Sequence, residues 1–348
     1  MKIKAIDLFC GAGGLTFGLE KAGIEVVAGF DVDAGCKFPY EANNGARFYQ
    51  QNLAKPDIAL MRKLLTDEGP TLIAGCAPCQ SFSTYNRERA GDRRGWPLLA
   101  SFLNIVRTIK PDFVTMENVS GLRADGSFTR FCAGLTKAGF EISFEVLDCR
   151  NYGMAQQRRR LVLIASRHGI VPMPKQTRVK AEEFATVRDA IGKMPKLRAG
   201  TSDSDDSLHS ASSISAINLE RLRASKPGGT WRDWPKKLRA PCHTKASGDG
   251  YVSVYGRMEW DKPSPTITGQ CYGFGNGRFG HPKQDRAISL REAAILQSFP
   301  VTYRFAKKGE KITFKRVGMM IGNAVPPILG EAIGRTIVAE ARKFQPAK

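Results

Sequence analysis

The first half of the chain alternates short β-rich runs with helical patterns. Strand-like runs such as KIKAIDLF, IEVVAGFD, LIAGC and RLVLIAS are separated by helical stretches such as LTFGLEKAG, SFLNIVRTIK and SFTRFCAGLTKAG. An alternation of strand and helix favours a doubly wound, mostly parallel α/β sheet. The crossovers between its parallel strands should be right-handed.

The amino-acid composition of the sequence changes after about residue 171. Several prolines, the polar stretch TSDSDDSLHSASSIS and a Gly-, Pro-, Trp- and Lys/Arg-rich region follow, which is typical of a smaller irregular lobe. SLREAAILQSFP and VGMMIGNAVPPILGEAIGRTIVAE then return to helical periodicity, and the last helix should pack back on the first part. We therefore expect three parts, over residues 1–175, 176–285 and 286–348.

The chain is strongly basic. Its 53 Lys and Arg against 33 Asp and Glu give a formal net charge of +20, which favours a polyanionic partner, with nucleic acid first and an anionic membrane surface second. No apolar stretch approaches the ~18 to 20 residues of a spanning helix, and the N-terminal MKIKAIDLF lacks a signal-peptide pattern. We expect a cytoplasmic protein.

Two cysteines three positions apart, in LIAGCAPCQSFS, allow a redox disulfide, half of a zinc site or one activated thiol. A redox pair needs a helix after the second cysteine, but QSFSTYNRERAGDRRGWP predicts a polar, basic loop. Structural zinc needs about four spaced ligands, and only four histidines and one Cys-x-x-Cys are present. We therefore expect free thiols and no metal.

A glycine-rich turn follows the first predicted strand. IDLFCGAGG runs into Gly11, Gly13 and Gly14, and Asp31 ends the next strand about 20 residues later, where it can accept hydrogen bonds from ribose hydroxyls. The pattern predicts a nucleotide-like ligand, against the alternative of a tight structural turn. A third glycine for NAD and a Walker lysine for ATP are both missing.

Six motifs carry a resemblance to a known family. DLFCGAGGL, PCQSFS, MENV, QQRRR, REAAILQSFP and IGNAVPP, in that order, resemble the motifs of the DNA cytosine-5 methyltransferases, and the match spans nearly the whole chain except about 175–260. The resemblance implies a Rossmann-like, class I methyltransferase fold, with a catalytic domain over 1–175 and a target-recognition domain over 176–285. It also implies S-adenosylmethionine as cofactor, S-adenosylhomocysteine as product, and no metal.

The same resemblance implies the catalytic residues. Carbon 5 of cytosine is a poor nucleophile, so a thiolate must first add at carbon 6, and the family assigns that thiolate to Cys79. Glu117 would hydrogen-bond the ring nitrogen, although it could also be a helix cap. QQRRR would add Gln156, Arg158 and Arg160 to the catalytic residues. Arg160 would contact the cytosine and Arg158 would help to organise the site, and the two could converge on one side of an extended segment.

Two positions beside these motifs have no predicted role in the chemistry. Cys76 matches no catalytic position of the family, so we expect a small, buried residue at a strand end. Ala155 stands where the family usually has a proline, which leaves the turn before QQRRR open.

The cofactor pocket is likewise implied by the resemblance. Phe9 would pack on the adenine, Asp31 with Val32 would hold ribose and adenine, and Asn52 stands where the family usually has an aspartate. The full set of implied cofactor residues is Phe9, Gly11, Gly13, Gly14, Leu15, Asp31, Val32, Asn52, Leu53, Pro78, Asn323 and Val325.

A cytosine inside a duplex cannot present carbon 6 to a thiolate, so the base must be flipped out. Residues 81–97, which include four arginines, fit a closing loop that neutralises phosphates, or a basic surface loop without that role. The residues that select the DNA sequence should lie at about 185–280. The implied DNA-binding residues are Gln80, Ser83, Arg93, Arg94 and Thr266.

The sequence therefore predicts a monomeric enzyme that methylates cytosine in a specific sequence of double-stranded DNA, with a cognate restriction endonuclease acting separately where one exists. One alternative is a tRNA cytosine-5 methyltransferase of the same superfamily, whose members lack the ~100 residues that stand here between the motifs. The other is a non-catalytic DNA-binding protein on a methylase scaffold, which the intact Cys79, Glu117 and Arg160 disfavour.

Overall fold

The computed structural model describes residues 2–65, 69–78, 96–244, 250 and 252–344. The chain divides into two compact units. The first unit comprises Met1–Tyr152, Arg159–Thr177 and Ala324–Lys348, and the second comprises Gly153–Arg158 and Arg178–Asn323. The chain passes between the units more than once, so position in the sequence alone does not define them.

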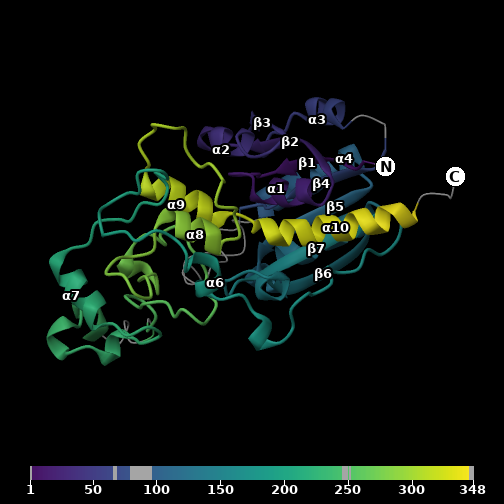
Figure 1. Ribbon diagram of the computed structural model, residues 1–348. Coiled ribbons are helices and arrows are strands. Elements are labelled where there is room, and N and C mark those ends of the chain that lie inside the picture. The colour runs from purple at the N-terminus through teal and green to yellow at the C-terminus, as the bar shows by residue number, and fades with distance from the viewer. Residues whose placement is uncertain (1, 66–68, 79–95, 245–249, 251, 345–348) are drawn as a thin grey trace. The chain divides into compact units, whose positions relative to one another are not determined.

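The first unit is built on a seven-stranded sheet with the order β3-β2-β1-β4-β5-β7-β6 (Figure 1). The strands are β1 Lys4–Leu8, β2 Glu25–Asp31, β3 Arg47–Gln50, β4 Thr71–Gly75, β5 Phe113–Val119, β6 Glu141–Asp148 and β7 Arg159–Ser166. The first five strands pair in parallel, and β7 runs antiparallel to both β5 and β6. The predicted doubly wound, mostly parallel sheet is confirmed.

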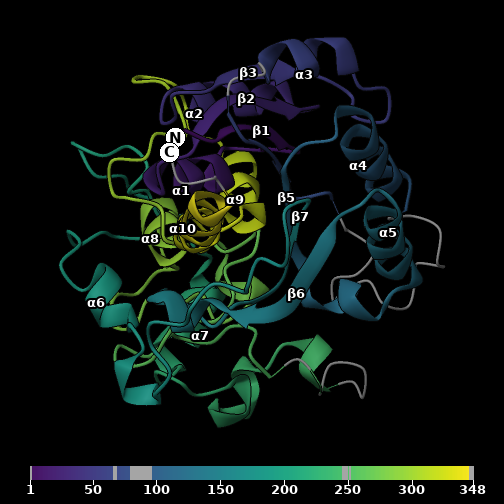
Figure 2. The ribbon, with the colours of Figure 1, turned by 90° about the vertical axis from the view of Figure 1, so that its right-hand side faces the viewer.

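Helices cover both faces of this sheet. They are α1 Gly14–Lys21, α2 Lys37–Glu41, α3 Ile58–Leu64, α4 Trp96–Ile109, α5 Gly126–Lys137 and α10 Pro327–Lys343. Figure 2 shows α1 and α10 on one face and α4 and α5 on the other. The β-branched and aromatic side chains of the strands are buried between these layers, because a central parallel sheet is covered on both sides.

The close contact between α1 and α10 depends on glycine. A Cβ at Gly18 would lie 2.3 Å from the Pro327 carbonyl oxygen, and one at Gly334 would lie 2.7 Å from the Ala22 Cβ. Both distances are shorter than van der Waals contact. The two helices can therefore approach only where these side chains are absent.

The second unit contains short helices joined by irregular segments. Its α-helices are α6 Val187–Ile191, α7 Ala216–Ala224, α8 Leu290–Leu296 and α9 Phe314–Asn323. One small apolar core combines Trp231, Trp234 and Phe274 with aliphatic neighbours from α7 and the 287 region. None of the helices in the described part of the chain is long and apolar enough to cross a lipid bilayer.

The order of the strands locates a ligand site in the first unit. Chain order runs outward from β1 to β3 on one side and from β1 through β4 to β5 on the other, so the direction reverses between β1 and β4. Open parallel sheets bind ligands outside the carboxyl ends of their strands at such a reversal. The segments that follow β1, β2, β4 and β5 meet at this edge.

Candidate active site

Glu117 lies near the carboxyl end of β5 and is nearly inaccessible, with 3% of its side chain exposed. It is a strand residue paired with Val162 of β7, so it is not the helix cap that was considered as an alternative. Its Oε2 accepts a hydrogen bond from the Cys76 thiol at 3.0 Å. Cys76 directly follows β4, the neighbouring parallel strand.

Arg160 supplies the counter-charge for this carboxylate. Its Nε lies 2.9 Å from Glu117 Oε1, and 14% of its side chain is exposed. A buried carboxylate without a cation carries a large desolvation cost, so the pair explains how Glu117 is tolerated there. Oε1 nevertheless has no aligned hydrogen-bond donor. Oε1 is itself buried, so the ion pair with Arg160 is its main polar contact.

Cys76 differs from its expected role. The sequence predicted a buried, chemically silent residue, but Cys76 is half-buried and its thiol contacts Glu117. The reason is the parallel pairing of β4 with β5, which brings residues 41 positions apart to the same sheet edge. The sequence of one strand does not predict which residues of the neighbouring strand lie beside it.

Asn118 is a residue that the sequence analysis missed. Its side chain is 2% exposed, and its Nδ2 donates to the Ala77 carbonyl oxygen at 3.0 Å. This bond ties β5 to the segment that leads into Cys79, two residues after Ala77. The only sequence signal was the amide beside Glu117 in MENV.

The glycine turn after β1 forms a cradle of backbone groups. Phe9, Gly11 and Gly13 all have positive φ angles, of 58°, 52° and 93°. The Gly11 amide donates to Asp31 Oδ2 at 2.9 Å, which joins the turn to the end of β2. A Cβ at Gly11 would have nothing within 4 Å, and the neighbouring Val32 is 65% exposed.

The remaining implied cofactor residues differ in exposure. Gly14 and Leu15 are buried in the first turn of α1, while Leu53 and Val325 are buried elsewhere in the first unit. Asn52 and Pro78 are exposed in the first unit, and Asn323 is exposed in the second.

Asp7, in β1 just before the glycine turn, is a second buried residue that the sequence patterns did not single out. Only 1% of it is exposed, and its Oδ2 accepts a hydrogen bond from the Thr16 hydroxyl at 2.7 Å. Burial raises the pKa of Asp7 to about 7, against the opposing effect of the Thr16 hydrogen bond. An acidic residue inside an apolar strand run was the available signal.

Gln156 and Arg158 organise backbone within the second unit. Gln156 Nε2 donates to the Leu296 carbonyl oxygen and to Gln297, and its Oε1 accepts from the Ile267 amide at 3.0 Å. Arg158 donates to the carbonyl oxygens of Ile267 and Gly322. The two side chains therefore hold the segment that carries Thr266.

Thr266 itself binds the main chain at the same place. Its hydroxyl donates to the Gln157 carbonyl oxygen at 2.7 Å, and the residue is exposed. The Ser264 amide donates to the Ala155 carbonyl oxygen at 2.9 Å. The segment before QQRRR is thus fixed although Ala155 replaces the usual proline.

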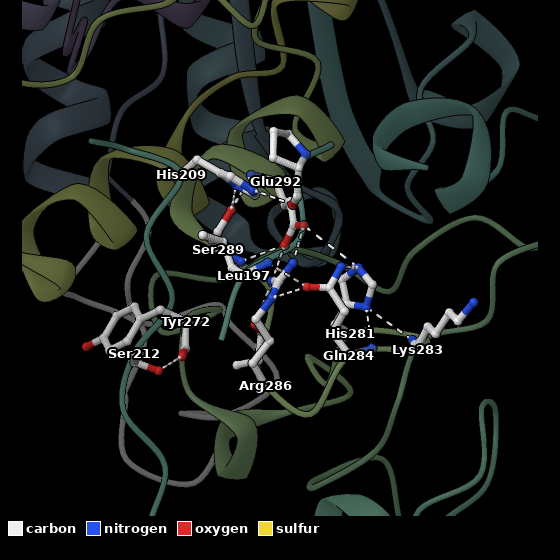
Figure 3. A network of polar contacts seen from close by, with 12 residues as sticks. Leu197, His209, Ser212, Tyr272, His281, Lys283, Gln284, Arg286, Ser289 and Glu292 are labelled. Atoms are coloured by element: carbon white, nitrogen blue, oxygen red, sulfur yellow. Dashed lines mark hydrogen bonds and ion pairs between the residues drawn. The ribbon is translucent and has the colours of Figure 1, made fainter. Parts of the chain in front are cut away.

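A buried polar network anchors α8 of the second unit (Figure 3). Glu292 receives two hydrogen bonds of 2.7 Å from Arg286, and Ser289 caps the helix. Burial alone would raise the pKa of Glu292, but the hydrogen bonds and charge of Arg286 lower it. Burial lowers the pKa of His281 to about 4, so this ring is neutral at pH 7.

His209 extends this network to the polar stretch that the sequence marked as irregular. Its two ring nitrogens lie 2.9 Å from the Ser289 hydroxyl and from the Pro195 carbonyl oxygen. These contacts attach α8, the helix predicted from REAAILQSFP, to the irregular segments of the second unit. Periodicity predicted the helix but not these partners.

Comparison with known proteins decides the family. The family model of C-5 cytosine-specific DNA methylases matches residues 3–339. The type II methylase M.HgiDII of Herpetosiphon aurantiacus is 48% identical over 95% of this chain and 94% of its own. The chain belongs to the C-5 cytosine-specific DNA methylase family. Its activity is methylation of carbon 5 of cytosine in DNA, for which the family uses S-adenosylmethionine as donor.

Solved structures share the fold of this methylase. A putative DNA modification methyltransferase from an E. coli prophage has a TM-score of 0.71 and 21% identity, over 97% of this chain and 99% of the other. The Entamoeba histolytica methyltransferase EhMeth has a TM-score of 0.65 and 16% identity, over 98% and 99%.

Part of the predicted methylase site lies outside the described residues. These positions are Cys79, Gln80, Ser83, Arg93 and Arg94. The basic loop over 81–97 lies outside them as well, except for its last two positions. Within the described part of the chain, no group of three or more His, Cys, Asp or Glu side chains is arranged to hold a metal ion.

Proposed function

We propose that this methylase acts through a covalent adduct between Cys79 and carbon 6 of a cytosine that has been flipped out of double-stranded DNA. The observation that carries the proposal is the Glu117 carboxylate, which is buried against Arg160 near the carboxyl end of β5 and accepts a hydrogen bond from the Cys76 thiol. It lies one strand away from β4, whose carboxyl end leads to Cys79.

In one turnover, the bond between the Cys79 sulfur and carbon 6 of cytosine forms and then breaks. The Cys79 thiolate adds to carbon 6, and the ring electron pair moves toward the ring nitrogen and carbon 5. The ring nitrogen takes up a proton, which it shares in a hydrogen bond with the Glu117 carboxyl group, and Arg160 holds that group. After carbon 5 has gained the methyl group, a base from the solvent removes its proton. The electron pair of that carbon–hydrogen bond re-forms the double bond between carbons 5 and 6, and the carbon 6–sulfur bond breaks to return the Cys79 thiolate.

The cradle after β1 fits S-adenosylmethionine. When bound, this cofactor supplies an electrophilic methyl group on a sulfonium sulfur. The exposed Val32 offers an apolar surface for the adenine, and the Asp31 carboxylate retains acceptor capacity for ribose hydroxyls. The open space beside Gly11 lets the methionine part approach the backbone.

Double-stranded DNA is the proposed substrate, and the net charge of +20 supports it. Arg93 and Arg94 would contact phosphates, and residues 176–285 would select the sequence. We further propose that the protein is monomeric and cytoplasmic, and that any cognate endonuclease is a separate protein.

The first test replaces Cys79 with serine. Because a serine hydroxyl is far less acidic than a thiol, Cys79→Ser should lower methyl transfer to duplex DNA by ~10³-fold or more. The measurement is bisulfite sequencing of DNA from a methylation-free host that expresses each variant. Cys132→Ala, a change in α5, serves as the matched cysteine control.

Two results would contradict this proposal. Near wild-type methylation by Cys79→Ser would exclude the covalent step. Methylation of tRNA by the wild-type protein, with duplex DNA unmodified, would favour the tRNA enzyme and exclude the proposed substrate.

A further inference from the structure

Cys76 is the first cysteine of the Cys-x-x-Cys pattern and has no part in the chemistry described above. Its thiol donates to Glu117 Oε2 at 3.0 Å, while Arg160 Nε lies 2.9 Å from the other oxygen. The two oxygens of one carboxyl group are thus held from two sides. Oε1 is itself buried and has the ion pair with Arg160 but no aligned hydrogen bond.

We propose that Cys76 is a positioning residue that fixes the rotation of the Glu117 carboxyl group, so that this group has one set orientation when the target cytosine arrives. The inference rests on the proposed function and deepens it. It assigns to a thiol a role that needs no oxidation and no metal.

The physical argument is one of rotation. A glutamate has three side-chain torsions, and ordering them costs conformational entropy. Arg160 alone contacts one oxygen and leaves the last torsion free to exchange Oε1 with Oε2. A donor on Oε2 makes the two oxygens unequal before the substrate arrives, and a carboxyl group already in place contributes more to the rate.

The surrounding structure keeps the thiol in place. The Cys76 amide donates to the Leu8 carbonyl oxygen at 3.2 Å. The next carbonyl oxygen, that of Ala77, accepts from the buried Asn118 side chain at 3.0 Å. The segment from the end of β4 to Ala77 is therefore attached to β1 on one side and β5 on the other. Cys76 can hold Glu117 because its own backbone is held.

The test compares two substitutions at this position. Cys76→Ala removes the donor with little change in volume, and we expect kcat to fall about 10-fold, the effect of one hydrogen bond to a charged group. KM for duplex DNA, KM for S-adenosylmethionine and the melting temperature should stay at wild-type values. Cys76→Ser restores a donor and should return kcat to within about threefold of wild type.

A third variant controls for the loss of a thiol as such. Cys132 is half-buried like Cys76 but lies in α5, so Cys132→Ala should leave all of these quantities unchanged. A wild-type kcat for Cys76→Ala, or a Cys76→Ser variant as slow as Cys76→Ala, would overturn the inference. So would a fall in kcat accompanied by a raised KM or a lower melting temperature, which indicates only a structural role.

The outcomes separate this inference from the proposed function. If the wild-type protein methylates duplex DNA and Cys76→Ala does so equally fast, the inference alone fails. If the wild-type protein does not methylate duplex DNA, the proposed function fails first.

Discussion

Two carboxyl groups of the first unit show how surroundings decide chemistry at the scale of a residue. Glu117 and Asp7 are almost equally inaccessible. Glu117 is paired with an arginine and accepts a hydrogen bond from the Cys76 thiol. Asp7 is held by a neutral hydroxyl, and burial raises its pKa to about 7.

The raised pKa of Asp7 predicts a pH-dependent stability. Between its ordinary value of 3.8 and about 7, the folded state binds the Asp7 proton more tightly than the unfolded state does. The contribution of Asp7 to the free energy of unfolding is therefore greatest below pH ~4. It decreases as the pH rises toward 7, by an amount of the order of a few kcal/mol.

Asp7→Asn removes this titration. The variant should lose less stability than wild type between pH 5 and pH 8, measured as the urea midpoint at both values. The raised pKa of Glu20, which is also about 7, is common to both proteins and cancels in the comparison. Equal losses in the two proteins would show that Asp7 does not titrate in this range.

At the scale of elements, sequence patterns predicted what is local. The run into IDLFCGAGG predicted a strand, a turn and a helix, and the structure has β1, three positive φ angles and α1 there. Contacts between distant segments could not be predicted in this way. The bond from Asn118 to Ala77 and the network around Glu292 depend on strand register and loop paths, which periodicity does not encode.

The contact of α1 with α10 gives a prediction at this scale. Gly18→Ala places a Cβ 2.3 Å from the Pro327 carbonyl oxygen and 2.5 Å from the Glu331 amide nitrogen, so α10 must shift. We expect a loss of about 1 to 3 kcal/mol, seen as a lower melting temperature. Gly126→Ala, at the start of α5, has nothing within 4 Å and should be nearly neutral. Equal melting temperatures for the two variants would contradict this account of the packing.

At the scale of the whole molecule, each compact unit brings together residues that are far apart in the sequence. The glycine cradle, Glu117 and Arg160 lie in the first unit, and Gln156, Arg158 and Thr266 lie in the second. The net charge of +20 belongs to the chain as a whole and suits a polyanionic substrate. The six motifs predicted the family, but their order alone could not show which of these side chains hold backbone and which face a ligand.

The central claim is a bond between the Cys79 sulfur and carbon 6 of cytosine. A duplex oligonucleotide with 5-fluorocytosine at the methylated position tests it most directly, because fluorine cannot leave carbon 5 as a proton does. With S-adenosylmethionine present, we expect a complex that survives denaturation, with the oligonucleotide attached to the peptide that contains Cys79. A protein that methylates the unmodified duplex but forms no such complex on the fluorinated one would contradict the account.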